Sequence, residues 1–140
     1  MARRSSIDAV LAGIVTTLKN STGVTGTVST RVYTNVPQDT PYPYLVVTSP
    51  TDRREDTMGR FGSSVLVDVK AVSQYAGDKE AAQLTDQCIR ALDFVNPSLS
   101  GHSAIGVTWE GSDRFQEVVN GIPTRHHVAS FRVWTEQSSS

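Results

Sequence analysis

The stretch RVYTNVPQDTPYPYLVV, residues 31–47, places three of the chain's six prolines directly before a run of strand-forming residues. Pro37, Pro41 and Pro43 lack a backbone N–H and fix φ, so no helix crosses this region. Each proline also pushes the residue before it towards extended geometry, which predicts a stiff, kinked lead-in. The run at 44–47 predicts a strand, because it is aromatic and β-branched. The sequence leaves the Tyr42–Pro43 peptide bond open to cis or trans geometry.

Length and composition indicate one small domain with balanced charge. The 140 residues are assigned to a single domain, 1–140, with polar termini at 1–5 and 136–140. Thirteen Lys and Arg against fourteen Asp and Glu give a net charge of −1, which argues against affinity that comes from neutralising nucleic-acid phosphates. The single cysteine provides no disulfide framework and no thiolate metal cluster, and it fits synthesis in a reducing cytosol.

The N-terminal segment has a basic start and then an apolar run, as signal peptides do. Asp8 interrupts that run and Lys19 closes it, so it is shorter than the roughly 20 residues of a membrane span. Its apolar residues instead recur at helical spacing, which predicts an amphipathic helix of about four turns that packs on a sheet. These residues are Ile7, Val10, Leu11, Ile14, Val15 and Leu18.

The most unusual polar segment is PTDRREDTMGRFG, residues 50–62, which links two expected strands. It is longer than the roughly two to five residues of an ordinary hairpin loop. One interpretation is a solvated, mobile excursion. The other is a contact arm, because mixed charges on repeated copies of one chain supply both halves of each ion pair. Two apolar residues in this polar context favour contact. The candidate interface residues are Asp52, Arg53, Arg54, Glu55, Asp56, Met58, Arg60 and Phe61.

The chain around this arm alternates strand and helix patterns. Residues 21–30 are expected to form a polar connection, and a short strand is expected around 31–34. Residues 63–73 alternate with period two, which predicts a strand of an antiparallel sheet with one side towards solvent. A second helix is predicted from 79 to about 94, with Cys88 on its apolar stripe as a buried structural thiol.

The last third of the sequence predicts strands. Two extended segments, 104–110 and 115–119, are expected on either side of Gly111, Ser112 and Asp113. Asn120–Gly121 is the strongest hairpin signal in the chain and leads into a long strand over 124–135. The element order predicts an α+β fold: an antiparallel (mixed) β-sheet of about four to five strands, two α-helices packed on one face, and a long charged inter-strand arm.

The sequence offers no positive evidence for catalysis. His126 and His127 are adjacent on an expected strand, so their side chains point to opposite faces and cannot both bind one metal ion. The serines include no Gly-x-Ser-x-Gly elbow. The carboxylates of the arm share their segment with three arginines and no evident pocket. We therefore expect no enzyme activity, no catalytic or metal residues and no cofactor.

Several runs resemble the tail completion, or tail terminator, family of long-tailed bacteriophages. The resemblance extends from the first helix to the last strand, and its most specific part lies within residues 31–47. Other runs are ordinary strand and helix sequences that agree in order. The runs are Arg31-Val32-Tyr33, Val36-Pro37-Gln38, residues 42–47, residues 67–71, residues 89–92 and Phe131-Arg132-Val133.

This resemblance implies a structural protein of the virion tail or neck, made in the host cytoplasm, that assembles with itself as a ring, usually a hexamer. Such a ring caps the tail tube, ends tube polymerisation and provides the joining surface to the head connector. The implied partners are further copies of the chain, the tail tube protein and the head connector or stopper protein, with no membrane. DNA would pass through the lumen without specific binding, as the absence of a basic stripe also suggests.

Two other functions stay open at this point. One is another neck or tail ring protein, such as a tail tube or connector component with a related fold. The other is a small cytosolic enzyme or ligand-binding α+β domain, since a fold alone does not determine a function. A compact pocket with converging polar groups would favour the second, and a flat ring interface would count against it.

Overall fold

The computed structural model describes residues 5–54, 56, 61–74 and 79–137. It contains three helices and one mixed six-stranded sheet, which confirms the α+β class and adds one helix and at least one strand to the prediction. The elements in chain order are α1 (Ile7–Lys19), α2 (Thr22–Val28), β1 (Val32–Tyr33), β2 (Tyr44–Arg54), β3 (Gly62–Ser73), α3 (Lys79–Leu92), β4 (Ser98–Leu99), β5 (His102–Val119) and β6 (Ile122–Gln137).

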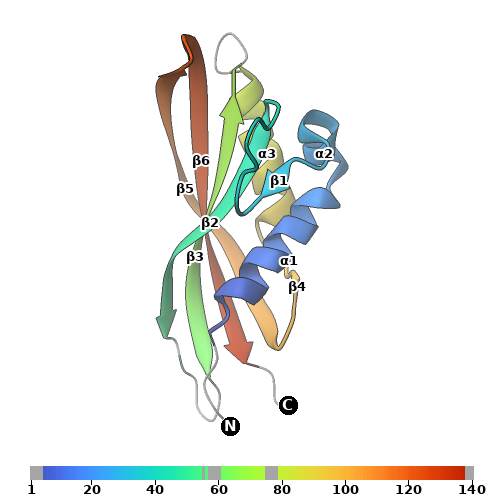
Figure 1. Ribbon diagram of the computed structural model, residues 1–140. Helices are drawn as coiled ribbons and strands as arrows, with labels where there is room; N and C mark the ends of the chain where they lie inside the picture. Colours follow the sequence, from blue (N-terminus) through green and yellow to red (C-terminus); the bar gives the residue numbers. More distant parts are fainter. Residues whose placement is uncertain (1–4, 55, 57–60, 75–78, 138–140) are drawn as a thin grey trace.

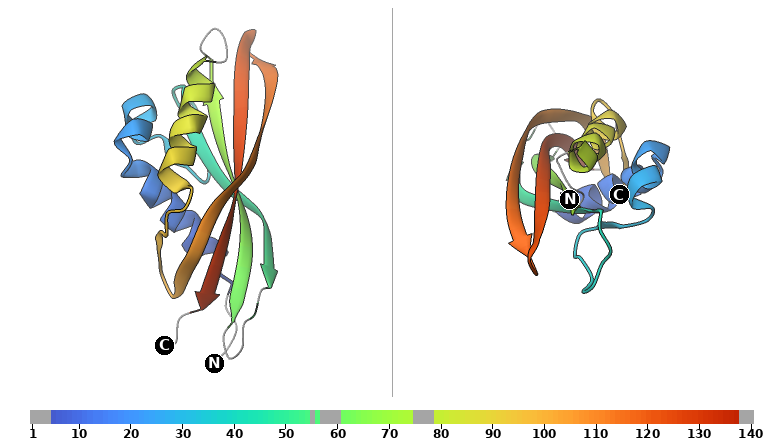
Figure 2. Two further views of the ribbon diagram at one scale, coloured as in Figure 1. Left: turned by 180° about the vertical axis from the view of Figure 1, so that it is seen from behind. Right: turned by 90° about the horizontal axis from the view of Figure 1, so that it is seen from above.

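The sheet has the strand order β1-β2-β3-β6-β5-β4. Only β1 and β2 pair in parallel; the other neighbours are antiparallel. The strands twist strongly, and all three helices lie on one side of the sheet (Figure 1 and Figure 2). One face of the sheet is thus covered by helices, and the other is open.

The core lies between the helices and the covered face. Alternate residues of β3 and β6, such as Val67 and its neighbour Phe131, point towards α1 and α3 and are fully buried. Cys88 of α3 is buried among them, as predicted, and burial raises the pKa of its thiol to about 12. It therefore stays protonated and packs as a small apolar side chain. The helices contribute Val10, Ile14, Leu18, Val24, Val28, Leu84 and Leu92 to this core.

Helix α2 occupies the segment that we expected to be a polar connection, so that prediction is wrong. Its Thr, Ser and Gly residues are weak helix formers and hide the pattern. Val24 and Val28, one helical turn apart, are both fully buried, and this packing stabilises the helix in place of propensity. A Cβ on Gly23 would lie 2.2 Å from Oε1 of Gln87, so glycine allows α2 to approach α3 closely.

Strand β5 is continuous where we expected a break at Gly111, Ser112 and Asp113. The pairing with β6 carries the strand through this polar stretch, and two register shifts absorb one extra residue each. At the Asn120–Gly121 turn, φ is 51° and 79°, as a two-residue hairpin turn of type I′ requires, and the predicted hairpin is confirmed.

The proline-rich segment forms a strap that holds β1 beside β2. The Arg31 side chain donates through Nε to the carbonyl of Pro43 (2.9 Å), and the Arg31 carbonyl accepts from the N–H of Leu45 (2.9 Å). The Tyr42–Pro43 bond is cis. Arg31 therefore links β1 to the start of β2 through two hydrogen bonds, and the role of the segment is structural.

The N-terminal end of α1 is fastened to the far end of the chain. The buried hydroxyl of Thr135 on β6 donates to Oγ of Ser6 (3.2 Å). The Ser5 hydroxyl donates to Oδ2 of Asp52 on β2 (3.0 Å). These contacts bring the two described ends of the chain to the same end of the sheet (Figure 1).

Candidate functional site

The candidate interface residues of the charged arm, residues 52–61 of the segment 50–62, lie only partly in the loop that we expected. Asp52, Arg53 and Arg54 belong to β2 and pair with Val65, Ser64 and Ser63 of β3, because the backbone ladder continues past the core into the polar segment. The first three residues of the arm therefore form the end of β2. Glu55, Met58 and Arg60 lie outside the described residues.

The described residues of the arm form contacts within the chain. Nε of Arg54 contacts Oδ2 of Asp56 at 2.6 Å, and Oδ1 of Asp56 accepts from the N–H of Gly62 at 3.2 Å. Arg53 is exposed, and Phe61 is half-buried, with its carbonyl accepting from the N–H of Gln137. The Arg54 side chain is itself 75% exposed, so this ion pair contributes little to stability. Arg53 and Arg54 are thus two exposed arginines on the end of β2.

On each side of the sheet, a short outer strand leaves a long part of the next strand's edge without a partner strand within the described residues. β1 covers β2 only at Leu45 and Val46, so the β2 edge, residues 47–54, has no strand beside it within the described residues. β4 covers β5 only at His102 and Ser103. The β5 edge, residues 110–119, likewise has no neighbouring strand in the part of the chain that the structure describes. The two edges lie on opposite sides of the sheet.

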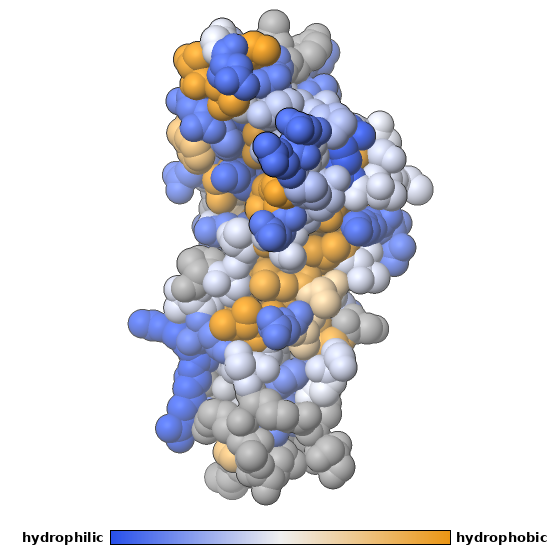
Figure 3. Space-filling model, viewed as in Figure 1, coloured by the Kyte–Doolittle hydropathy of each residue, from blue (hydrophilic) through white to orange (hydrophobic). Residues whose placement is uncertain are grey.

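The loop between α3 and β4 closes the β5 side as far as Trp109. The N–H of Phe94 donates to the carbonyl of Val107 (2.8 Å), and the N–H of Trp109 donates to Oδ1 of Asp93 (2.9 Å). Beyond this point, residues 112–118 are all exposed. Two of these residues, Phe115 and the 67% exposed Val118, are apolar, and they give the end of the β5–β6 hairpin an apolar surface. Figure 3 shows this surface as an orange cluster at the end of the hairpin, and a second apolar band along α1.

A row of four side chains crosses the open face of the sheet, one from each of β2, β3, β6 and β5. This open-face row consists of Tyr44, Val72, His126 and Phe115, which are successive cross-strand partners. The rings of Phe115 and His126 stack with centroids 4.4 Å apart and planes 5° apart. Val72 and His126 are buried although no helix covers them, because the larger side chains at the two ends shield the middle.

Burial shifts the pKa values of two ionisable side chains of this row, His126 and Tyr44. Nε2 of His126 lies 2.7 Å from Oε1 of Glu117, and within the described residues its buried Nδ1 has no hydrogen-bond partner. Burial is the main cause that lowers the pKa of His126 below 6.5; the hydrogen bond to Glu117 opposes it. Burial likewise raises the pKa of Tyr44 above 10, helped by the nearby Tyr42 and Glu117. His126 is therefore neutral at pH 7 and donates to Glu117 through Nε2.

The sequence contains a signal for this row that the prediction did not use. A two-residue turn at Asn120–Gly121 places residues opposite one another at equal distances from the turn. Phe115 and His126 are each five positions from it, so the hairpin register alone places them together. Which face is covered, and which edge is free, depends on strand order, and no local pattern encodes that order.

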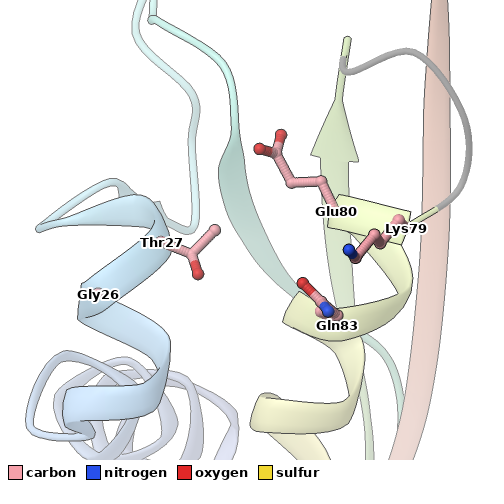
Figure 4. Close-up of a pocket in the computed structure, with 5 residues that line it drawn as sticks. All are labelled: Gly26, Thr27, Lys79, Glu80 and Gln83. Carbon is pink, nitrogen blue, oxygen red and sulfur yellow. The ribbon is translucent and has the colours of Figure 1, made fainter.

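Clefts on the helical side offer little chemistry. The cleft between α2 and α3, about 420 Å³, is lined by Gly26, Thr27, Lys79, Glu80 and Gln83 (Figure 4). Oε1 of Glu80 already accepts from the Ser73 hydroxyl (2.7 Å). Within the described residues, no three His, Cys, Asp or Glu side chains come together as a metal site would require. None of the described helices is long and apolar enough to cross a membrane.

Comparisons with known proteins find one family and similar solved structures. Residues 12–136 match the family model described as Tail completion protein gp17. Among solved structures, a chain of the virion of a native gene transfer agent (GTA) particle matches with a TM-score of 0.84 and 18% sequence identity, covering 96% of this chain and 99% of that chain. At that identity the match shows a shared fold. The comparison with curated proteins finds no match.

Proposed function

Because the chain belongs to the tail completion family, and is therefore a structural component of a phage tail, we propose that it is a tail terminator. Copies of the chain form a closed ring, with the hexamer as the expected size. The ring caps the tail tube, ends its polymerisation and offers a joining surface to the head connector. The observation that carries this proposal is the family match, which extends from within α1 to the end of β6.

The surfaces of the subunit support assembly in a ring. A closed ring of identical subunits needs two different surfaces on each copy, one that faces the next copy and one that faces the previous copy. The β2 edge and the β5 edge are two such surfaces, because they lie on opposite sides of one sheet and differ in sequence. A net charge of −1 also suits a lumen through which DNA moves without being held.

Mixing the purified chain with tail tubes tests the proposed function. We expect the chain to form rings of one size, measured by native mass spectrometry, and to appear as a single layer at tube ends in electron micrographs. Tubes with capped ends should then stop growing when tube protein is added. A chain that polymerises beyond one ring would act as a tube component, and a chain that stays monomeric with tubes present would contradict the proposal.

The charged arm is the proposed contact with a neighbouring subunit or the adjacent tail ring. Replacing Arg53, Arg54 and Arg60 with Gln together should weaken assembly while the subunit stays folded, because the arm then loses its positive charges across the interface. The matched control is Arg90→Gln, which removes an exposed arginine of α3 that pairs with Asp86 at one helical turn. If the triple variant caps tubes as well as this control does, the arm is not an interface.

A further inference from the structure

We propose that the β5 edge of one subunit pairs, backbone to backbone, with the β2 edge of a second copy of this chain, so that adjacent subunits share one continuous sheet. This inference rests on the proposed ring function and names the contact that closes the ring. Unpaired strand edges are templates for pairing with another chain. The β5 edge offers ten residues beyond the point where the loop between α3 and β4 stops covering it.

The hydrogen-bond pattern shows which backbone groups of β5 point outward. Val119 and Ile122 flank the two-residue turn, so they exchange both hydrogen bonds with each other. In an antiparallel ladder such pairs alternate with pairs that bond away from each other. The N–H groups of Phe115 and Glu117 therefore point to β6, and those of Ser112, Gln116 and Val118 point away from it.

Two independent features agree with this alternation. The alternation continues past the register shift between Trp109 and Gly111, so the backbone groups of Val107 and Trp109 should point outward. They do: the Val107 carbonyl accepts from the N–H of Phe94, and the Trp109 N–H donates to Asp93. Pro123 stands opposite Val118, where a strand needs no N–H towards β5. Three observations thus agree on which N–H groups of the β5 edge point outward: the Val119–Ile122 pair at the turn, the two hydrogen bonds to the loop, and Pro123.

The ladder between β2 and β3 likewise fixes which backbone groups of the β2 edge point outward. The N–H of Leu45 donates outward to Arg31, and Leu45 pairs with Ala71 of β3. Six residues earlier on β3, Val65 occupies an equivalent place in the ladder, and its partner on β2 is Asp52. The N–H of Asp52 therefore also points outward, beyond the register shift between Thr48 and Thr51.

Charge favours β2, and not a second β5, as the partner. The β5 edge carries Glu110, Asp113 and Glu117 against Arg114, a net charge of −2, so two β5 edges would repel each other. The β2 edge carries one Asp and two Arg, a net charge of +1. The free part of β5 is at the hairpin end of the sheet, and the free part of β2 is at the opposite end (Figure 1). Such a stagger is what tilted strands in a closed sheet require.

The first test blocks each edge with a proline. Gln116→Pro removes an outward N–H of β5 while it keeps the bonds to β6, and Gln116→Ser is its matched control with the N–H intact. Asp52→Pro does the same on β2, with Asp52→Asn as its control. We expect each proline variant to need at least about tenfold more protein for half-assembly than its own control does. Gln116→Ser should assemble as the unaltered chain does, and Asp52→Asn measures separately what loss of the Asp52 carboxylate, which also accepts from Ser5, costs.

Mixing the two proline variants tests the pairing itself. Each variant keeps one intact edge, and these two intact edges are different, so the mixture should form 1:1 dimers that neither variant forms alone. Native mass spectrometry distinguishes the dimers if one variant carries a heavy-isotope label. Rings formed by both proline variants, or a mixture that yields only monomers, would overturn the inference.

Hydrogen exchange provides a test that needs no substitution. In the free subunit, the amides of Gln116 and Val118 should exchange at least about tenfold faster than those of Phe115 and Glu117. In the ring all four should exchange slowly. If the unaltered chain forms rings in which Gln116 and Val118 still exchange fast, the edge contact is wrong and the terminator proposal stands. If the unaltered chain forms no ring with or without tubes, the terminator proposal itself fails.

Discussion

The two faces of the sheet are built from the same strands, yet they bury their side chains by different means. On the covered face, helices pack over Phe131 and its neighbours, and Phe131 is 0% exposed. On the open face, the open-face row protects its own middle, and its outer member Phe115 is 50% exposed. The comparison teaches that burial along one strand does not follow one face: β6 buries Phe131 towards the helices and His126 away from them.

The largest expected effect is the difference in stability lost when a phenylalanine is truncated on each of the two faces, because only the covered face leaves an enclosed cavity. Phe131→Ala should lower the free energy of unfolding by about 3–5 kcal/mol, because helices and strands enclose the space on all sides. Phe115→Ala should cost only about 1 kcal/mol, mostly the stacking on His126, since solvent already reaches the ring. Urea unfolding of both variants measures the difference. Equal losses would mean that the open face is as tightly packed as the core.

A second prediction concerns only the open face and acid pH. The pKa of His126 is lowered by burial below the 6.5 of an exposed histidine, so on acidification the unfolded chain binds the proton first. This residue adds no pH dependence above about pH 6.5 and destabilises the fold progressively as the pH falls below that value.

The matched variant is His126→Phe, which keeps a ring against Phe115 and removes the titration. Its free energy of unfolding should fall less steeply between about pH 6.5 and 5 than that of the unaltered chain. An NMR titration of His126 provides the direct measurement. A His126 pKa above 6.5 would show that the hydrogen bond to Glu117 outweighs burial.

The smallest expected effect lies in the helical layer that distinguishes the covered face. Gly26 of α2 has open space around the position of a Cβ, so Gly26→Ala should stabilise the fold by up to about 1 kcal/mol through helix propensity. Gly23→Ala gains the same propensity but must displace the end of the Gln87 side chain, so its net effect should be closer to zero. Thermal unfolding compares the two, and an equal gain would show that the contact with Gln87 is loose.

Local patterns predicted the elements that carry their own signal. The alternation over 63–73 predicted β3, helical spacing predicted α1 and α3, and Asn120–Gly121 predicted the hairpin. Helix α2 was missed because only Val24 and Val28 carry its apolar face among weak helix formers. The break expected at Gly111 did not occur, because a long partner strand supplies hydrogen bonds that no local pattern reveals.

The candidate surfaces were predictable to a smaller extent. The sequence identified the charged arm from its composition, but it did not predict that Asp52, Arg53 and Arg54 would extend β2. The free edges follow from the strand order and from the shortness of β1 and β4, which depend on contacts between distant parts of the chain. The arm as an interface stays a prediction, and so does the expectation that the chain is not an enzyme.

The hydrogen bond between Ser6 and Thr135 has a practical consequence for imaging. Because it holds the two described ends of the chain at one pole of the molecule, a probe fused to either terminus marks that pole. A small epitope inserted at the turn between Asn120 and Gly121 marks the opposite pole. Electron micrographs of the two labelled versions would therefore show which pole of each subunit faces the tube.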